Sequence, residues 1–326
     1  MRTRPPRAHP QRSALATAAV AALAVSAALA APQPAAAAES SPVGFGAGTT
    51  GGGSATAVTV STLDAFKSAV AGSTSKVVRV NGLISLSGQV DIGSNTTVLG
   101  VGSASGFTGG GLRLKKVTNV VVRNLNISKP VAPADGITVQ ASTKVWLDHN
   151  AFSSDLDHGK DYYDGLLDIN HGSDYVTVSW NTFKNHYKGS LVGHSDNNAS
   201  EDTGHLRVTY HHNWFDRVNS RIPGLRFGTG HFYDNYVVGA STAVHSRMGA
   251  QMLVQNNVFR DTEVAVTTNR DSDVDGYANL TGNDLGGAAT EVSQVGTFTS
   301  PPYGYTVEPA STVVASVTAG AGTGKL

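Results

Sequence analysis

The sequence contains no cysteine, and this absence excludes several kinds of stabilisation and chemistry. None of the 326 residues is cysteine. Disulfides cannot hold the fold together, so a packed core must supply its stability. A thiolate nucleophile and a cysteine-ligated zinc site are also excluded.

The chain also lacks an excess of charge of either sign. It has 24 basic and 24 acidic residues, but four of the arginines fall in the first 38 residues, which contain no acidic residue. The remaining residues carry 20 basic and 24 acidic side chains, a net charge of −4. Nucleic-acid-binding proteins are normally basic, so we expect no nucleic-acid partner. An acidic protein that binds a polyanion needs clustered cations or a bridging metal.

The beginning of the chain has the composition of a secretory signal peptide. A basic start is followed by an alanine-rich apolar run over residues 13–31 and by the small residues Ala35–Ala38. This pattern predicts a signal peptide at residues 1–38 and one mature domain at residues 39–326. A membrane anchor is the alternative, disfavoured by the short, alanine-rich run. We therefore expect a secreted, extracellular protein without membrane attachment. The arginines of the basic start are Arg2, Arg4, Arg7 and Arg12.

A short phrase recurs along the middle of the chain. Alternating β-branched residues lead to an asparagine and often to an aromatic residue, which predicts one strand per phrase. The phrases are VVVRNLNI (120–127), KVWLDHNAF (144–152), YVTVSWNTF (175–183), RVTYHHNWF (207–215), HFYDNYVV (231–238) and MLVQNNVF (252–259). Their asparagines are Asn124, Asn150, Asn181, Asn213, Asn235 and Asn257, and Asn283 follows.

A strand-bearing repeat of twenty to thirty residues predicts a solenoid. Helical repeats would show a 3.6-residue period, and a propeller blade needs about 40–45 residues. The sequence therefore predicts an all-β, single-domain right-handed parallel β-helix. We expect the asparagines to stack as a hydrogen-bonded ladder, although any single asparagine is equally a turn former. The longer intervals between Asn150 and Asn213 place the binding side within residues 130–230.

Two helices are expected at the ends of the solenoid. The segment Ser61–Asp64 resembles a capping box and begins an amphipathic helix through Phe66 and Val70. This N-terminal capping helix would cover the first coil, whose edge is otherwise open. A second short helix is expected around residues 310–317.

Three aspartates are candidate metal ligands. Asp164 and Asp168 occur in YDGLLDI, and Asp135 occurs in ADGI one coil earlier. A straight strand would separate the first two by about 13 Å, but a turn at Gly165 would bring them together. Asp135 could join them from the neighbouring coil, about 4.8 Å away. Clustered carboxylates suit Ca²⁺, whereas aspartates beside glycine are often only turn formers.

Three cations lie in the same region. Arg221 and Arg226 bracket Pro223 in RIPGLRFG, and Lys188 lies one coil earlier in HYKGSLVGHSD. In a net-acidic protein such a group could bind carboxylates. Ordinary surface salt bridges are the alternative interpretation.

Taken together, these phrases resemble polysaccharide lyase family 1, the pectate lyases. The resemblance spans about residues 43–326, nearly the whole mature chain. Its segments, in family order, are SNTTVLGVG (94–102), VWLDH (145–149), YDGLLDINHGSDYVTVSWNTF (163–183), KGSLVGHSD (188–196), LRVTYHHNWFDRV (206–218) and RIPGLRFG (221–228).

The resemblance implies a role for each candidate residue. Arg221 matches the catalytic arginine that is the proposed base, while Lys188 and Arg226 match substrate-binding cations. Pro133 stands where some relatives carry a further acid, so a second protein-held calcium is not expected. In VWLDH, the resemblance gives Trp146 and its neighbours Asp148 and His149 a structural role near the site. The implied Ca²⁺ ligands are Asp135, Asp164 and Asp168.

The implied reaction is β-elimination on α-1,4-polygalacturonate by a monomeric enzyme. A base would remove the C5 proton, and the C4 oxygen would leave to give a 4,5-unsaturated sugar. Arginine is normally always protonated, so Arg221 could instead stabilise charge while water or hydroxide takes the proton. The histidines of this region offer a rival base, although we expect them to be structural: His194, His211 and His212.

Three rival functions share the expected fold. A polygalacturonase would need carboxylates set up for acid and base roles, and the neighbouring cations favour elimination instead. A calcium-independent pectin lyase should lack the acidic ligands, whereas all three positions are aspartate here. A noncatalytic carbohydrate-binding solenoid would bind polymer without turnover.

Overall fold

The computed structural model describes residues 1–5 and 38–326. The chain divides into two units, Met1–Gln33 and Pro34–Leu326, and the fold below is that of the second. The expected signal peptide therefore lies almost entirely outside the described residues. In the part of the chain that the structure describes, no helix has the length and apolarity needed to cross a membrane.

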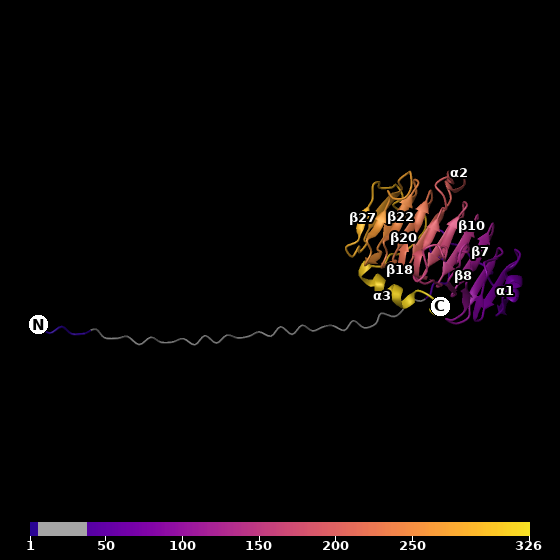
Figure 1. The fold of residues 1–326 in the computed structure, drawn as a ribbon, viewed down its shortest axis with the longest axis horizontal. Coiled ribbons are helices and arrows are strands. Elements are labelled where there is room, and N and C mark those ends of the chain that lie inside the picture. Colours follow the sequence, from indigo (N-terminus) through magenta and orange to yellow (C-terminus); the bar gives the residue numbers. More distant parts are fainter. Residues whose placement is uncertain (6–37) are drawn as a thin grey trace. The chain divides into compact units, whose positions relative to one another are not determined.

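Parallel strands stack into a solenoid with three faces (Figure 1). One face is a ten-stranded parallel sheet, in which the register joins Val98 to Val122 and Val122 to Leu147. Its strands, in order, are β1 (Ala57–Val60), β2 (Lys76–Val80), β5 (Thr96–Gly100), β8 (Thr118–Arg123), β11 (Thr143–Asp148), β14 (Asp174–Ser179), β17 (Arg207–His211), β20 (Thr229–Tyr233), β23 (Gln251–Gln255) and β26 (Tyr277–Thr281).

Two further rows of strands complete each coil. They join into one sheet, because Ser220 of one row pairs with Thr242 of the other. The first row is β3 (Leu83–Ser85), β6 (Gly106–Thr108), β9 (Asn126–Ser128), β12 (Ala151–Ser153), β15 (Thr182–Lys188), β18 (Trp214–Ser220), β21 (Tyr236–Val238) and β24 (Val258–Arg260). The second row, here called the site face, is β4 (Gln89–Asp91), β7 (Gly111–Lys115), β10 (Ile137–Gln140), β13 (Leu167–Asn170), β16 (Ser190–Val192), β19 (Gly224–Arg226), β22 (Thr242–Arg247), β25 (Val264–Thr267) and β27 (Ala289–Glu291).

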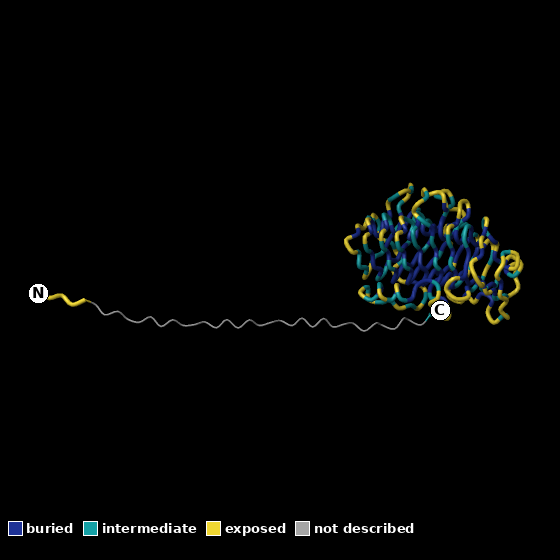
Figure 2. The backbone as a smooth tube through the Cα atoms, turned by 60° about the horizontal axis from the view of Figure 1, so that its bottom comes forward, coloured by how far each residue is buried: buried dark blue, intermediate teal, exposed yellow. Residues whose placement is uncertain are grey.

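The buried residues line the inside of the coils (Figure 2), and their side chains form one continuous core. Phe152, Phe183 and Phe215 are fully buried and form a stack with ring centroids 4.7 and 4.6 Å apart. The alternation seen in the sequence places these side chains inward and their neighbours outward. The right-handed parallel β-helix expected from the sequence is confirmed.

The asparagine ladder is continuous from Asn150 to Asn283. At each rung, the side-chain Oδ1 accepts from the backbone N–H and the Nδ2 of the asparagine one coil earlier, at 2.8–3.0 Å. The prediction was wrong for Asn124, because Leu125 occupies the matching place. Asn124 instead takes the left-handed conformation that precedes each rung, with φ of 58°. Side-chain type alone cannot distinguish these adjacent positions.

One helix caps the first coil of the solenoid, and two further helices lie in the loop after β16 and against strands β21 and β24. Helix α1 (Leu63–Val70) buries Phe66 and Val70, and Phe66 packs on Phe107 with centroids 4.7 Å apart, so the expected capping helix is confirmed. Its N-cap is Thr62, one residue later than expected, and the Thr62 hydroxyl accepts from the Ala65 N–H. Helix α2 (Ala199–Asp202) lies in a loop after β16, and α3 (Ala310–Gly320) is slightly longer than expected.

Both terminal segments run lengthwise over several coils. Near the N-terminus, the N–H groups of Phe45 and Gly46 donate to Thr209 and Thr177 at 3.0 and 2.9 Å, and Gly52 donates to Thr97. From the other end, the chain follows α3 back towards the first coils. Its Gly322 N–H donates to the Trp180 carbonyl, and its Gly324 N–H donates to the Asn124 side chain at 2.6 Å.

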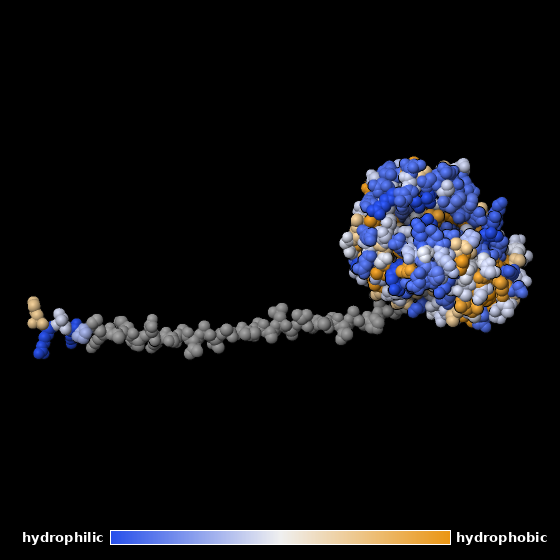
Figure 3. Space-filling model, viewed as in Figure 1, coloured by the Kyte–Doolittle hydropathy of each residue, from blue (hydrophilic) through white to orange (hydrophobic). Residues whose placement is uncertain are grey.

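The outer surface is mixed in polarity (Figure 3). In this view, strongly hydrophilic residues gather over the loops on the side of β22 and α2, while apolar atoms are denser towards α1. The surface on the side of β22 and α2 is therefore more hydrophilic in this view than the N-terminal end.

Candidate active site

The site face brings two of the three predicted aspartates together. Asp135 ends the loop before β10, and Asp168 lies within β13. These strands are paired in parallel with Thr138 opposite Asp168. The backbone N–H of Gly136 donates to the carbonyl of Gly165 at 2.9 Å, which fixes the two turns against each other.

Gly165 provides the space in which these two carboxylates meet. A Cβ atom at Gly165 would lie 2.4 Å from Oδ1 of Asp168 and 3.1 Å from Oδ1 of Asp135. Any side chain here would therefore collide with Asp168 and crowd Asp135. The turn expected at Gly165 does not use left-handed dihedral angles, because its φ is outside that range, and the missing Cβ is what lets the two carboxylates meet.

The pKa values of the two aspartates are raised because both carboxylates are buried close to other negative charges. Burial and the charge of Asp164 raise the pKa of Asp135 to about 6, although Thr138 opposes this by donating to Oδ2 at 2.6 Å. Burial and the neighbouring charge of Asp135 raise the pKa of Asp168, and the charge of Arg221 lowers it. Each carboxylate thus disfavours the ionised form of the other, and a nearby cation would relieve this.

Asp164 is directed towards Lys188. The Oδ1 atom of Asp164 accepts from the Lys188 ammonium at 3.1 Å and from the Gly165 N–H at 3.0 Å. Lys188, on β15, is 14% exposed and also reaches Asp161 at 3.3 Å. The predicted substrate-binding lysine and the third predicted ligand are thus an ion pair.

The aspartates fit a hard cation in their chemistry. In the described residues, no group of three or more histidine, aspartate or glutamate side chains is already arranged to hold a metal. However, Oδ1 of Asp168 is buried without any hydrogen-bond partner, and it faces the same small space as Oδ1 of Asp135. A buried, unpartnered carboxylate oxygen is costly unless a cation or donor satisfies it. Oxygen donors of this kind suit Ca²⁺.

Arg221 lies beside Asp168 at the start of the tight turn before β19. Its φ is 60°, and its carbonyl accepts from the Ser190 N–H at 2.6 Å, which holds this turn on the coil that precedes it. The side chain is partly exposed, and its charge acts on Asp168. The structure therefore places the predicted catalytic arginine at the aspartate pair.

Arg226 is more enclosed than the sequence suggested. It lies at the end of β19, is 12% exposed, and forms a close ion pair through Nε with Oδ1 of Asp196. Its Nη1 donates to the Gly193 carbonyl at 2.9 Å. Asp196 also accepts from Ser272 at 3.1 Å. Substrate would meet an arginine whose orientation is fixed by Asp196.

Arg247 is a further member of this cationic group, which no motif in the sequence indicated. It ends β22, pairs in register with Arg226, and is 6% exposed. Burial and the charges of Arg226 and Arg221 lower the pKa of Arg247 to about 10, and its buried Nε has no hydrogen-bond partner among residues 1–5 and 38–326. Its Nη2 and the Arg221 side chain both lie against Gly224. Only the register between coils could have revealed it.

A hydrogen-bond chain supports Asp135 from outside the predicted residues. The Gln89 amide on β4 donates to the Thr138 hydroxyl at 2.5 Å, and that hydroxyl donates to Asp135. The two partners come from coils separated by more than forty residues in the sequence. No sequence signal marked either of them.

The other residues selected from the sequence make contacts that support the fold. Asp148 is fully buried on the ten-stranded sheet, where it accepts from Arg123, His149 and Ser179 at 2.6–2.7 Å. It therefore supports a different face from the one that carries the aspartates. The rival base His211 is fully buried on the same sheet, and burial lowers its pKa well below the usual value.

The two other candidate bases, His194 and His212, also make their contacts away from the aspartates. His212 lies 3.2 Å from Glu308 of the C-terminal segment and stacks on Trp180 with centroids 4.2 Å apart. His194 lies beside His171 and Asn198 in the α2 loop. These contacts agree with a structural role.

Comparison with known proteins identifies the family. A family model described as pectate lyase matches residues 13–326. Pectate lyase A of Aspergillus niger is 48% identical over 84% of this chain and 84% of its own length. Pectate lyase B of Colletotrichum gloeosporioides is 49% identical, with coverage of 86% and 85%.

Solved structures agree with these relatives. The pectate lyase Bsp165PelA from Bacillus sp. N165, solved with trigalacturonate, has a TM-score of 0.80 at 32% identity, covering 87% of this chain and 99% of its own. Pectate lyase II from Xanthomonas campestris has a TM-score of 0.73 at 29% identity, covering 87% and 98%. By its family match, its relatives and its β-helix, the chain belongs to the pectate lyase family of enzymes.

Proposed function

We propose that this pectate lyase cleaves α-1,4-polygalacturonate by Ca²⁺-dependent β-elimination and releases 4,5-unsaturated oligogalacturonides. The observation that carries the proposal is the pair of mutually repelling carboxylates, Asp135 and Asp168, facing one space beside Arg221. Calcium would be held by Asp135, Asp164 and Asp168. When bound, the ion would offset the charge of the substrate carboxylate as a Lewis acid.

The difficulty of the reaction is the weak acidity of the C5 proton next to an ionised carboxylate. Arg221 is the proposed residue that receives this proton or stabilises the charge as it develops. The C5–H electron pair forms the C4–C5 double bond, and the C4–oxygen bond breaks. The leaving oxygen takes a proton from solvent, and the group that received the C5 proton returns it to solvent. Because the double bond replaces the broken C4–oxygen bond, no water is added to the product.

Lys188 and Arg226 are the proposed carboxylate-binding cations. Lys188 is held 3.1 Å from Asp164, and Arg226 is held by Asp196, so both are oriented before substrate arrives. Charge-assisted hydrogen bonds from prearranged donors become more valuable as negative charge grows in the transition state. The trigalacturonate complex of the Bacillus enzyme supports a substrate of this class.

The test follows cleavage of polygalacturonate by ultraviolet absorbance, with and without a chelator. We expect unsaturated, absorbing products, loss of activity with the chelator, and recovery with added Ca²⁺. Reducing ends without absorbance would identify a hydrolase and contradict elimination. Activity that resists the chelator would contradict the calcium requirement.

A thermal measurement tests the metal site without relying on activity. Ca²⁺ at a hundredfold excess over its dissociation constant should stabilise the fold by about 2.7 kcal/mol and raise the melting temperature. Asp168→Asn should abolish this rise, because the unpartnered Oδ1 is lost as a charged ligand. Asp273→Asn, at an exposed aspartate, is the matched control and should keep it. A full rise in Asp168→Asn would contradict the assignment.

We also propose that residues 1–38 are a secretory signal peptide and that the mature enzyme is an extracellular monomer. The basic, apolar and small-residue regions of this segment support the proposal. The mass of the protein recovered from the culture medium tests the boundary near Ala38. A mass that includes residues 1–38 would contradict it.

A further inference from the structure

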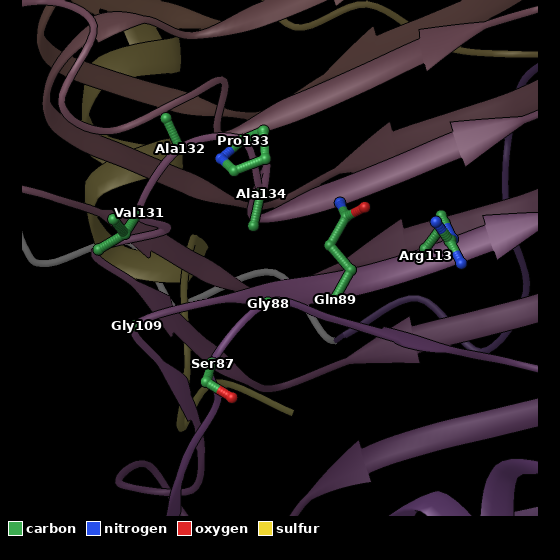
Figure 4. Close-up of a pocket in the computed structure, with 9 residues that line it drawn as sticks. All are labelled: Ser87, Gly88, Gln89, Gly109, Arg113, Val131, Ala132, Pro133 and Ala134. Carbon is green, nitrogen blue, oxygen red and sulfur yellow. The ribbon is translucent and has the colours of Figure 1, made fainter.

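A pocket of about 630 Å³ lies on the site face next to Asp135 (Figure 4). Gln89 and Arg113 enter it from β4 and β7, and the loop of residues 131–134 forms the opposite side. This volume is within the range of about 300–1,000 Å³ that is typical of small-ligand sites. Neither the proposed calcium ligands nor the three cations of the proposed reaction line it.

The pocket is continuous with the proposed reaction site. Ala134 lines it and directly precedes Asp135 in the chain. The Gln89 amide, which projects into the pocket in Figure 4, also begins the hydrogen-bond chain through Thr138 to Asp135. A polymer bound at the aspartates and extending towards the N-terminal coils would therefore place its next units here.

The charge in this pocket is already compensated. Arg113 is the one ionisable side chain among the described lining residues. Asp91 binds its guanidinium group through two hydrogen bonds of 2.6 and 2.8 Å. This pairing lowers the pKa of Asp91 and raises that of Arg113, so both stay ionised and neutralise each other.

The rest of the lining is neutral and largely apolar. Val131, Ala132, Pro133 and Ala134 supply the loop side. An ionised carboxylate placed here would lose hydration without gaining an unpaired cation, which is unfavourable. The methyl group of an ester would instead pack against the apolar loop. The pocket therefore differs in charge from the neighbouring region, where Lys188, Arg221 and Arg226 supply cations.

We propose that this pocket binds methyl-esterified galacturonate units of the same polymer chain, next to the unesterified unit at the aspartates. The inference rests on the proposed function and adds to it a preference for partly esterified pectin on one side of the cleaved bond. Gln89 and the guanidinium of Arg113 offer hydrogen bonds to sugar hydroxyls, and the loop covers the ester.

The test compares kcat/KM on partly methyl-esterified pectin with kcat/KM on polygalacturonate. Asp91→Asn keeps the shape of an exposed side chain but leaves the charge of Arg113 uncompensated. We expect the pectin-to-polygalacturonate ratio to fall by about threefold or more. Val131→Lys adds a cation at a position that is 40% exposed and should lower the ratio in the same way.

Val101→Lys is the matched control. Val101 is 42% exposed and lies outside the pocket, so its ratio should equal that of the wild type. An unchanged or increased ratio in Asp91→Asn would overturn the inference. This holds even if Val131→Lys lowers the ratio, because the larger side chain alone could block the pocket. Wild-type enzyme that cleaves polygalacturonate but no partly esterified pectin would overturn this inference alone. Activity on neither polymer would overturn the proposed function, and this inference with it.

Discussion

Among the described residues, some of the cationic side chains near the aspartates already form ion pairs, whereas others do not. Arg226 is paired with Asp196 and Lys188 with Asp164, whereas no hydrogen bond from the Arg221 guanidinium is found in the described part of the chain. Arg221 can therefore reach a substrate without breaking an existing ion pair. Catalysis should depend more sharply on its geometry than on its charge alone.

Arg221→Lys keeps the charge but replaces the planar guanidinium with a shorter-reaching ammonium. We expect kcat to fall by about a hundredfold or more, within the range for a proton-transfer group, while KM changes little. Steady-state kinetics on polygalacturonate measures both values.

Arg217→Lys is the control for this substitution. Arg217 lies on β18, four residues before Arg221, is 61% exposed, and shares the left-handed backbone, with φ of 54° against 60° for Arg221. It should retain wild-type kcat. Near wild-type kcat in Arg221→Lys would show that the reaction does not use the guanidinium group.

At this scale, the sequence predicted residues that lie in recognisable phrases and missed those that act through neighbours. Lys188 and Arg221 stand in phrases whose resemblance to a family marks them. Arg247 pairs with Arg226 of another coil, at a distance in sequence that varies with loop length. Thr138 contacts Asp135 within its own coil, but its other partner, Gln89, comes from an earlier coil. No spacing rule can therefore pair them. A turn was expected at Gly165, but the structure needs glycine there because a side chain would occupy the space of Asp168.

At the scale of the elements, neighbouring coils are joined by the side-chain hydrogen bonds of the asparagine ladder as well as by strand pairing. The Asn213 amide donates to Asn235 and to the Val178 carbonyl at 2.9 Å, and its Oδ1 accepts two hydrogen bonds from Asn181 at 3.0 Å. All of these groups are buried. Removing one amide therefore leaves several polar groups without partners.

Asn213→Ala should lower the free energy of unfolding by about 3 kcal/mol, because buried donors and acceptors lose their partners. Asn283→Ala removes the last rung, which is partly exposed and ties to only one neighbouring asparagine, and should cost about 1 kcal/mol. Thermal unfolding measures both. Equal losses at the two positions would contradict the cooperative role of the ladder.

The sequence predicted these elements because their signals repeat. Alternation and recurring asparagines mark strands and coils many times over, so single errors do not alter the fold. The errors were local: Leu125 replaced Asn124 at one rung, and Thr62 replaced Ser61 as the helix cap. Each differs by one residue, which pattern alone cannot fix because neighbouring polar residues compete for the same turn.

For the molecule as a whole, the free energy of unfolding should depend on pH, because buried acids and buried histidines change it in opposite directions. Burial raises the pKa of Asp234 to about 8 and that of Glu39 to about 7. The folded protein thus holds protons that the unfolded chain releases near pH 4, and stability falls as pH rises towards 8. Burial lowers the pKa of His231 and His245 to about 4, so their contribution is lost as pH falls below 6.5.

Above pH 6.5 the histidine contribution is complete and only the acids still titrate. We therefore expect the melting temperature to fall between pH 6.5 and 8.5, measured in chelator so that bound metal does not vary. Asp234→Asn should flatten this decline, since asparagine cannot ionise and tolerates the left-handed φ of 51°. Exposed Asp261, with φ of 45°, gives the control Asp261→Asn. A decline that persists unchanged in Asp234→Asn would contradict this assignment.

The terminal segments that cross the coils have a consequence for how the molecule comes apart. A bare solenoid joins each repeat only to its neighbours and can fray from either end. Here the turn-rich segment that contains Phe45 and the tail that ends near Gly324 each bind coils far apart in the stack, from Thr97 to Thr209 and from Trp180 back to Asn124. Peeling off an outer coil would mean releasing one of these ties first. The site face therefore lies on a solenoid whose coils are tied together along its length, and we expect these coils to unfold together although the chain has no disulfide.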